Sequence, residues 1–299
     1  MKQTVTPALR QWIIEQASAG FAPDAVLEAM KSSGWDEDVA ISAMESTLRE
    51  HLQSQNKSAT RASPPAADVP RTASPVVARP ASSLPDVALS GAANQIDVGD
   101  GLVEVIASLI NPRVLVLGHF LSDEECDGLI AAARPRMARS LTVETKSGGE
   151  ELNPDRTSNG MFFTRGQTPL IERIEARIAR LVNWPLENGE GLQVLHYRPG
   201  AEYKPHYDYF DPKEPGTPTI VKRGGQRVAT LIMYLNEPTR GGATVFPDIG
   251  LEVAPLRGNA VFFSYDKPEP STRSLHGGTP VLEGEKWVAT KWLREGVFT

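Results

Sequence analysis

Apolar positions in the first part of the chain recur with the period of α-helices. Three runs place apolar side chains three or four positions apart, as in helices that bury one face. These residues are Leu9, Ile13 and Ile14, then Val26, Leu27 and Met30, then Val39, Ile41 and Met44. Gly20 and Gly34 separate the runs, and glycine is a common helix stop signal. We therefore predict a small three-helix bundle over residues 1–52.

The helical period ends after this module. Residues 53–100 are rich in Ala, Ser, Pro and Val, and prolines recur at nearly regular intervals: Pro64, Pro65, Pro70, Pro75, Pro80 and Pro85. Proline at this density is incompatible with helix or sheet interiors and favours extended conformations. The pattern predicts a disordered Pro-rich linker that acts as a semi-stiff spacer.

From residue 101 to residue 299 the pattern is that of one larger domain. It opens with a strand over 113–117. A helix follows, at whose N-terminus Ser122 and Glu125 form a capping box, and then an amphipathic helix over 169–181. Short strand-like runs separated by Gly and Pro follow, at 191–197, 203–209, 226–235, 243–246, 259–264, 278–281 and 286–294. This order favours a mainly β fold, an antiparallel sandwich or barrel with helices packed outside.

Charge and composition exclude several classes of function. With 31 Lys and Arg against 37 Asp and Glu, the chain lacks the positive charge that nucleic-acid binding requires. The start of the chain has no apolar core of a secretory signal, and no apolar run approaches the roughly 20 residues of a membrane span. We expect a cytoplasmic protein with neither nucleic acid nor membrane as a partner. Because Cys126 is the only cysteine, a metal ion would be held mainly by histidine and carboxylate.

A candidate metal site begins in the stretch KPHYDYFDP. Strand alternation points His206 and Asp208 to the same face, although two polar residues on an exposed strand would give the same pattern. A third ligand is needed, and His276 is the natural candidate, because the only other histidines of the chain are His51, His119 and His196. Two histidines and one carboxylate form the ligand set of non-haem Fe(II) oxygenases.

A lysine in the stretch GEKWVATKW extends this hypothesis. Alternation places Lys286 on one strand face with Val288, Thr290 and Trp292. Burying an unpaired ammonium group is costly, so a buried lysine there implies an anionic partner. A dicarboxylate that chelates the metal at one end and meets Lys286 at the other would fit. The alternative is a surface lysine on an edge strand.

Three longer stretches resemble the 2-oxoglutarate- and Fe(II)-dependent prolyl 4-hydroxylase family. They are LQVLHYRPGAEYKPHYDYFDP, GGQRVATLIMYLNEPTRGGATVFP and LHGGTPVLEGEKWVATKWLRE, and the resemblance extends over about residues 113–295. It implies a double-stranded β-helix, or jelly-roll, oxygenase domain. It also implies a procollagen-proline 4-dioxygenase-like reaction, in which O2 is consumed, a prolyl residue of a peptide or protein is hydroxylated at C4, and succinate and CO2 are released.

The resemblance also implies roles for single residues. By position, His206, Asp208 and His276 bind Fe(II), and Lys286 binds the distal carboxylate of the co-substrate 2-oxoglutarate. Tyr197 matches a tyrosine that hydrogen-bonds the same carboxylate region, and Thr244 lines that pocket. Tyr203, Arg227 and Trp292 match positions that contact the substrate peptide, although an exposed strand charge is the alternative for Arg227. Ascorbate is a further candidate cofactor. The segment TVETKSGGEELNPDRTSNGMFF is similar to a mobile loop that closes over the peptide in this family.

Two alternatives to peptidyl-prolyl hydroxylation remain open. One is a 2-oxoglutarate oxygenase for a free amino acid or another small molecule. The other is a partner-recruiting protein whose oxygenase activity is secondary, because Gly20-Phe21 and Gly34-Trp35-Asp36 resemble ubiquitin-associated-like three-helix modules and imply a protein partner for residues 1–52. An accessory bundle without such a partner fits equally well. The physiological substrate, the oligomeric state and modification of the linker prolines in cis also stay open.

Overall fold

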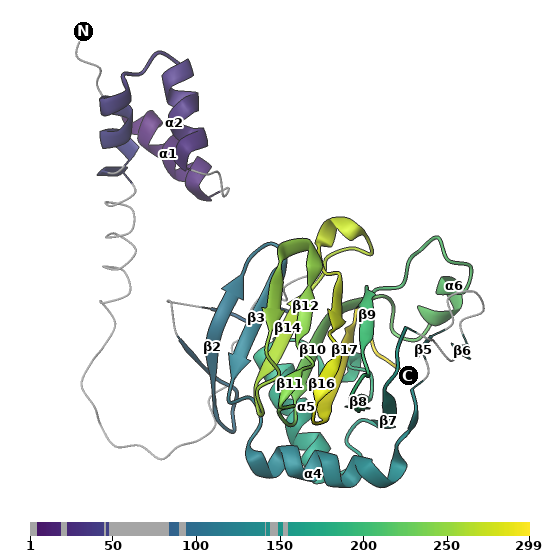
Figure 1. Cartoon of the computed structure of the whole chain (residues 1–299). Coiled ribbons are helices and arrows are strands. Elements are labelled where there is room, and N and C mark those ends of the chain that lie inside the picture. The colour runs from purple at the N-terminus through teal and green to yellow at the C-terminus, as the bar shows by residue number, and fades with distance from the viewer. Residues whose placement is uncertain are drawn as a thin grey trace, which may run out of the picture. The chain divides into compact units, whose positions relative to one another are not determined.

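The computed structural model describes residues 5–18, 23–44, 46–47, 84–89, 94–140, 142–143, 149–151 and 155–299. The chain divides into two units, Met1–Val77 and Ala78–Thr299, and each is treated by itself (Figure 1). Residues 53–83 and 90–93 of the predicted linker lie outside the described residues. The linker prediction is wrong for its described part, because residues 95–97 form a strand and Val87 and Val98 are buried in the core of the second unit. Every described helix is too short or too polar to span a bilayer.

The first unit contains α1 (Pro7–Ser18), α2 (Pro23–Ser32) and helical residues at 37–44. Its buried core consists of Ile13, Val26, Met30, Ala40, Ala43 and Met44. Gly34 adopts a positive φ of 88° after α2, a conformation that glycine takes at little cost. The prediction that Ile41 is buried is wrong, because its side chain is 39% exposed. Ala40, Ala43 and Met44 share the buried face, and Ile41 lies about a quarter turn away from Ala40.

The second unit is built on two antiparallel sheets. The larger sheet has nine strands in the order β1-β2-β3-β14-β10-β17-β8-β7-β4, and the smaller has four in the order β13-β12-β15-β9. The strands of the larger sheet are β1 (Gln95–Asp97), β2 (Leu102–Leu109), β3 (Arg113–Gly118), β4 (Ala138–Arg139), β7 (Asn159–Phe163), β8 (Leu192–Tyr197), β10 (Arg227–Tyr234), β14 (Ala260–Ser264) and β17 (Lys286–Arg294). Those of the smaller sheet are β9 (Tyr203–His206), β12 (Thr244–Phe246), β13 (Leu251–Val253) and β15 (His276–Gly278).

Short strand pairs and helices complete this unit. The pairs are β5 (Thr142–Val143) with β6 (Glu150–Glu151) and β11 (Arg240–Gly241) with β16 (Val281–Glu283). The helices are α4 (Asp123–Ala133), α5 (Pro169–Leu181), α6 (Thr217–Ile220) and the 3-10 turns η2 (Arg134–Arg136), η3 (Leu186–Asn188), η4 (Pro247–Ile249) and η5 (Pro270–Thr272). The prediction of a mainly β fold with flanking helices is confirmed.

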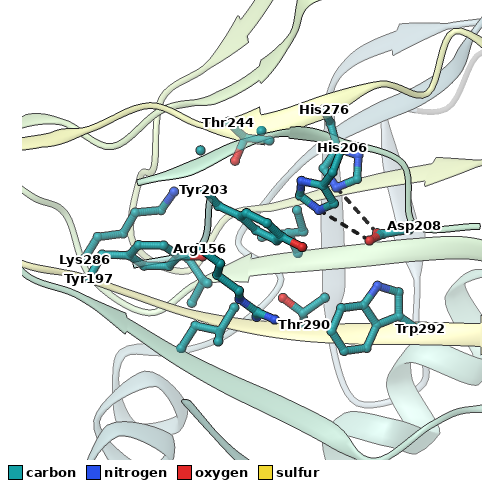
Figure 2. Close-up of a pocket in the computed structure, with 15 residues that line it drawn as sticks. Arg156, Tyr197, Tyr203, His206, Asp208, Thr244, His276, Lys286, Thr290 and Trp292 are labelled. Atoms are coloured by element: carbon teal, nitrogen blue, oxygen red, sulfur yellow. Dashed lines mark ion pairs between the residues drawn. The ribbon is translucent and has the colours of Figure 1, made fainter. Parts of the chain in front are cut away.

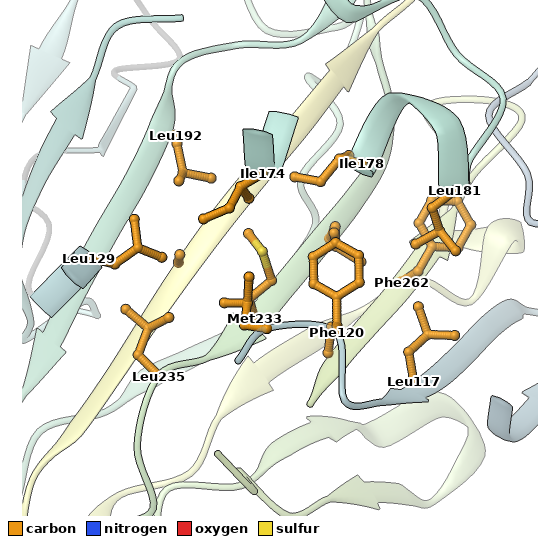
Figure 3. Close-up of a cluster of buried hydrophobic side chains, with 14 of the residues drawn as sticks. Leu117, Phe120, Leu129, Ile174, Ile178, Leu181, Leu192, Met233, Leu235 and Phe262 are labelled. Carbon is orange, nitrogen blue, oxygen red and sulfur yellow. The ribbon is translucent and has the colours of Figure 1, made fainter. Parts of the chain in front are cut away.

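Helices α4 and α5 cover one face of the larger sheet (Figure 1). Helix α4 starts with the predicted capping box of Ser122 and Glu125, and α5 starts at Thr168, whose hydroxyl accepts a hydrogen bond from the N–H of Ile171. The apolar side chains of both helices meet those of the sheet (Figure 3). Prominent members of this core are Leu117, Phe120, Leu129, Ile174, Ile178, Leu181, Leu192, Met233, Leu235 and Phe262.

A second core lies between the two sheets and surrounds the candidate site. Tyr234, Phe246, Phe263 and Val288 are among its buried members. Strand β17 is buried along its whole length, because alternate side chains enter the two cores. Trp287 and Leu293 join the core under the helices, whereas Val288 joins the core between the sheets.

Two predicted strands differ from the observed ones. The strand predicted over 203–209 ends at His206, because His206 pairs with His276, the first residue of β15, and β15 provides no partner beyond it. The strand predicted over 278–281 is divided between β15 and β16. Asp208 therefore reaches the face of His206 from the bend after β9 and not by strand alternation.

Candidate active site

Pairing of β9 with β15 brings the three predicted metal ligands together. His206 and His276 are register partners across the two strands. Asp208 Oδ1 lies 3.5 Å from His206 Nε2, and Asp208 Oδ2 lies 3.4 Å from His276 Nε2. One ligand atom from each of the three residues lies within 4.8 Å of the other two (Figure 2). The arrangement is that of a three-ligand metal site.

Main-chain carbonyl groups fix the orientation of both imidazole rings. His206 Nδ1 lies 2.9 Å from the carbonyl oxygen of Lys204, and His276 Nδ1 lies 3.0 Å from that of Ser274. A carbonyl only accepts, so Nδ1 carries the proton in each ring. The lone pair of Nε2 is then directed to the metal side in both histidines.

The electrostatic surroundings give these groups the protonation states that a metal requires. Burial lowers the pKa of His276 to about 4, so its ring is neutral at pH 7. Burial alone would raise the pKa of Asp208, but His276, His206 and Arg227 hold it well below its usual range. A neutral imidazole and an ionised carboxylate are the forms that bind metal ions.

Lys286 lies at the other end of the same pocket. It is 5% exposed, and its Nζ lies 5.5 Å from the ring centre of Tyr197 and 5.7 Å from that of Tyr234. Among the residues that the structure describes, no carboxylate forms an ion pair with it, and burial lowers its pKa to about 7. The alternative of a surface lysine is therefore wrong. Thr244 lies nearby, and its hydroxyl oxygen accepts a 2.8 Å hydrogen bond from Tyr234.

One pocket contains nearly all the predicted site residues. Lys286 and Tyr197 lie at one end and the histidines and Asp208 at the other (Figure 2). The predicted residues that line it are Tyr197, Tyr203, His206, Asp208, Thr244, His276, Lys286 and Trp292. A small anion between the two ends would contact both the metal-binding groups and the buried ammonium.

Tyr203, one of the aromatic residues predicted to contact the substrate, lies beside the metal ligands. The ring of Tyr203 stacks on that of His206 with centroids 3.7 Å apart. The guanidinium of Arg156 lies 4.9 Å from the centre of the Tyr203 ring. Tyr203 thus links the metal ligand His206 to Arg156 on the wall of the pocket.

Arg227 does not line the pocket, but it lies against Trp292, which does. Its guanidinium carbon is 4.0 Å from the centre of the Trp292 ring. The side chain is only 9% exposed, so the alternative of an exposed strand charge is wrong. Two hydrogen bonds of 2.6 and 2.9 Å join it to the carboxylate of Glu190.

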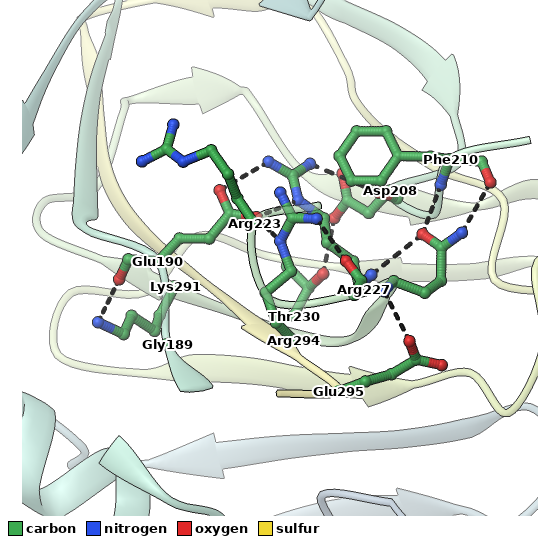
Figure 4. Close-up of polar contacts among 12 residues, drawn as sticks. Gly189, Glu190, Asp208, Phe210, Arg223, Arg227, Thr230, Lys291, Arg294 and Glu295 are labelled. Atoms are coloured by element: carbon green, nitrogen blue, oxygen red, sulfur yellow. Dashed lines mark hydrogen bonds and ion pairs between the residues drawn. The ribbon is translucent and has the colours of Figure 1, made fainter. Parts of the chain in front are cut away.

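Glu190 is the centre of a buried charge network (Figure 4). Its carboxylate also accepts a 2.6 Å hydrogen bond from Arg294, and its main-chain carbonyl accepts one from Lys291. Lys291 in turn pairs with the buried Glu175 of α5 at 2.5 Å. Buried charges persist when they are paired and hydrogen-bonded, and this network holds Arg227 in place.

Some site residues were missed in the sequence. Arg156 lines the pocket and donates a 2.8 Å hydrogen bond to Gln193. It lies in a stretch without hydrophobic periodicity, so the family resemblance of the segment RTSNGMFF was its only signal in the sequence. Glu190 gave no signal, and neither did Thr230, whose hydroxyl donates a 2.7 Å hydrogen bond to Asp208. Their roles depend on contacts between distant parts of the chain.

Comparison with known proteins identifies the family. Residues 192–294 match the family model of the 2OG-Fe(II) oxygenase superfamily. The chain is 44% identical over 221 residues to prolyl 4-hydroxylase 5 of Arabidopsis thaliana, covering 67% of this chain and 74% of that protein. It is 45% identical over 203 residues to prolyl 4-hydroxylase 1 of the same plant, covering 62% and 70%. A solved structure of the viral collagen prolyl hydroxylase of Paramecium Bursaria Chlorella virus-1, in its 2OG complex, matches 60% of this chain and 95% of that one, with 32% identity and a TM-score of 0.48. The chain belongs to the prolyl 4-hydroxylase family of 2-oxoglutarate- and Fe(II)-dependent dioxygenases.

Proposed function

We propose that this dioxygenase hydroxylates C4 of prolyl residues in a peptide or protein segment. The observation that carries the proposal is a single pocket with a metal-ligand set at one end and a buried lysine at the other. Among the described residues, this lysine has no anionic partner. Two relatives that are 44% and 45% identical to this chain are prolyl 4-hydroxylases.

The donor set fits Fe(II). Two neutral imidazoles and one carboxylate suit a metal that keeps open positions for other ligands, and His206, Asp208 and His276 would hold it. Bound iron supplies the activation of O2, coupled to conversion of 2-oxoglutarate to succinate and CO2. The protein's part is to fix the ligands: the carbonyls of Lys204 and Ser274 hold the two rings in position.

Lys286 and its neighbours fit the far carboxylate of 2-oxoglutarate. An ammonium in this buried position gains an ion pair when a carboxylate arrives, which offsets part of its desolvation cost. Thr244 accepts its hydrogen bond from Tyr234, so its own hydroxyl proton remains to be donated into the pocket. Tyr197 would add a second hydroxyl at this end.

Tyr203, Trp292 and Arg227 would receive the peptide. The first two present aromatic faces near the metal ligands, and the indole N–H of Trp292 has no hydrogen-bond partner in the described part of the chain. Arg227 is held by Glu190, so its position is set before the substrate arrives. Aromatic rings would pack on the pyrrolidine ring and keep water away from the reacting carbon.

The experiment that tests the proposal is incubation of the full chain with Fe(II), 2-oxoglutarate, O2 and two kinds of substrate. Proline-containing peptides form one arm and free L-proline with other amino acids forms the second. Succinate release and a one-oxygen mass gain on a peptide proline, both lost in His276→Ala, would support it. Mass gain on free amino acids alone would replace it with a small-molecule oxygenase.

Three further inferences from the sequence remain predictions. They are a cytoplasmic location, ascorbate as a cofactor, and a protein partner for residues 1–52. The domain boundary at residue 52 is also a proposal. Turnover with and without ascorbate, and pull-down with residues 1–52 deleted as the control, address the second and third.

A further inference from the structure

The carboxylate of Asp208 is held by a residue outside the metal-ligand set. Thr230 lies in the central strand β10 and is 0% exposed. Its hydroxyl donates a 2.7 Å hydrogen bond to Oδ2 of Asp208 (Figure 4). Because Asp208 follows the end of β9 and is not held by strand pairing, this bond is the contact that ties its side chain to the larger sheet.

A second hydroxyl lies behind Thr230. The Tyr265 hydroxyl is 3.1 Å from Thr230 Oγ1. Threonine has a single hydroxyl proton, and Thr230 gives that proton to Asp208, so Thr230 must accept in its bond with Tyr265. The two hydroxyls therefore form a directional relay, from Tyr265 to Thr230 to Asp208.

Packing fixes the start of this relay. Tyr265 is 2% exposed, and its main-chain N–H donates to the carbonyl of Val228 at 3.0 Å. Its ring lies 6.2 Å from the rings of both Phe263 and Tyr209. The phenol cannot rotate away without disturbing this aromatic cluster, so the relay is rigid.

We propose that Thr230 and Tyr265 are positioning residues that orient the Asp208 carboxylate and thereby set the affinity of the metal site. The inference rests on the proposed iron site and concerns binding alone. A carboxylate already held in its binding orientation loses less freedom when the metal arrives, and ligand-orienting partners of this kind are typically worth 10–100-fold in metal affinity.

Metal titration of the full chain tests the proposal without peptide or 2-oxoglutarate. Co(II) is added to the metal-free protein, and binding is followed by calorimetry and by the visible absorption of the bound ion. Thr230→Val removes the hydroxyl at nearly constant volume and is expected to weaken Co(II) binding about 10–100-fold. Thr230→Ser keeps the hydroxyl and is expected to retain the wild-type affinity and absorption spectrum.

A variant of Tyr265 tests whether the effect of this tyrosine passes through Thr230. Tyr265→Phe is expected to weaken Co(II) binding less than Thr230→Val does, and to add nothing in a chain that already carries Thr230→Val. Tyr209→Phe is the matched control, since Tyr209 packs near Tyr265 and its hydroxyl makes no described hydrogen bond to Asp208 or Thr230. It is expected to leave the affinity unchanged.

Thermal unfolding of each metal-free variant identifies any that has lost its fold. If Thr230→Val unfolds, Tyr265→Phe against Tyr209→Phe decides the question, and equal affinities in the two would overturn the proposal. Unchanged Co(II) affinity in a folded Thr230→Val, or equal losses from Tyr265→Phe in both backgrounds, would also overturn it. A wild-type chain that binds Co(II) but does not hydroxylate peptides would count against the proposed function only.

Discussion

The charge of Lys286 should make 2-oxoglutarate binding depend on pH above neutrality. Burial lowers the pKa of this lysine to about 7 in the ligand-free protein, compared with about 10.4 for an unperturbed lysine. A carboxylate binds the protonated form, so binding must raise the pKa again. The sign follows: affinity is greatest below pH 7 and falls as pH rises through that value, because a growing fraction of the protein must first take up a proton.

The size of the effect follows from the same pKa. Each pH unit above 7 reduces the protonated fraction about tenfold, so the dissociation constant at pH 9 should be about 100-fold that at pH 6. Calorimetric titration of the metal-loaded protein with 2-oxoglutarate under anaerobic conditions measures it. The ligand itself stays fully ionised across this range.

Two variants isolate the lysine. The arginine of Lys286→Arg keeps its charge at every pH in the range. The affinity of this variant for 2-oxoglutarate should therefore stay constant between pH 7 and pH 9, whatever its absolute value. Lys286→Met should bind weakly at all pH values. A flat profile in the wild type, or the same decline in Lys286→Arg, would refute the assignment of this lysine to the co-substrate.

The remaining predictions concern the ligands, the charge network and the core. Asp208→Ala and His276→Ala should each abolish succinate formation while the circular dichroism spectrum stays that of the wild type; turnover in either would rule out the three-ligand assignment. Glu190→Gln weakens the pairing of two buried arginines and should destabilise the fold by about 3–5 kcal/mol in urea unfolding, and should raise KM for peptide more than KM for 2-oxoglutarate. Ile178→Ala, in the core under the helices, should cost about 2–5 kcal/mol and leave both KM values unchanged, so a selective rise in the peptide KM of this variant would contradict the separation of core and site.

Local rules predicted much of the fold. Helix α5 matches its predicted bounds, because a threonine cap, a proline in the first turn and a regular apolar stripe all favour the same start and face. The start of α4 was equally clear from Ser122 and Glu125. The end of β9 was not, because a strand ends where its partner ends, and the partner of His206 is a residue far along the chain.

The site divides in the same way. His206, Asp208, His276 and Lys286 were found because they stand in dense local motifs and carry chemistry that few other residues supply. Thr230 was not, since a buried threonine in a strand is indistinguishable in sequence from a packing residue until Asp208 is seen beside it. Residues that orient the metal ligands are identified by their contacts in three dimensions, and a single sequence contains little information about such contacts.

Strand β17 links the stability of this domain to its chemistry. Its residues alternate between the pocket and the core under the helices, so Lys286 faces the pocket while Trp287 packs beneath. A slip of one residue against β8 would exchange every side chain between the two faces, replacing the ammonium with an indole and burying the charge among the helices. The register, in which Lys286 pairs with Tyr197, is therefore a condition for the chemistry. At the end of β17 where the lysine lies, the N–H of Trp287 donates to Asn236 Oδ1 and Asn236 Nδ2 donates to the carbonyl of Glu285. These bonds tie β17 to the segment after β10, so a slip of β17 would also break them.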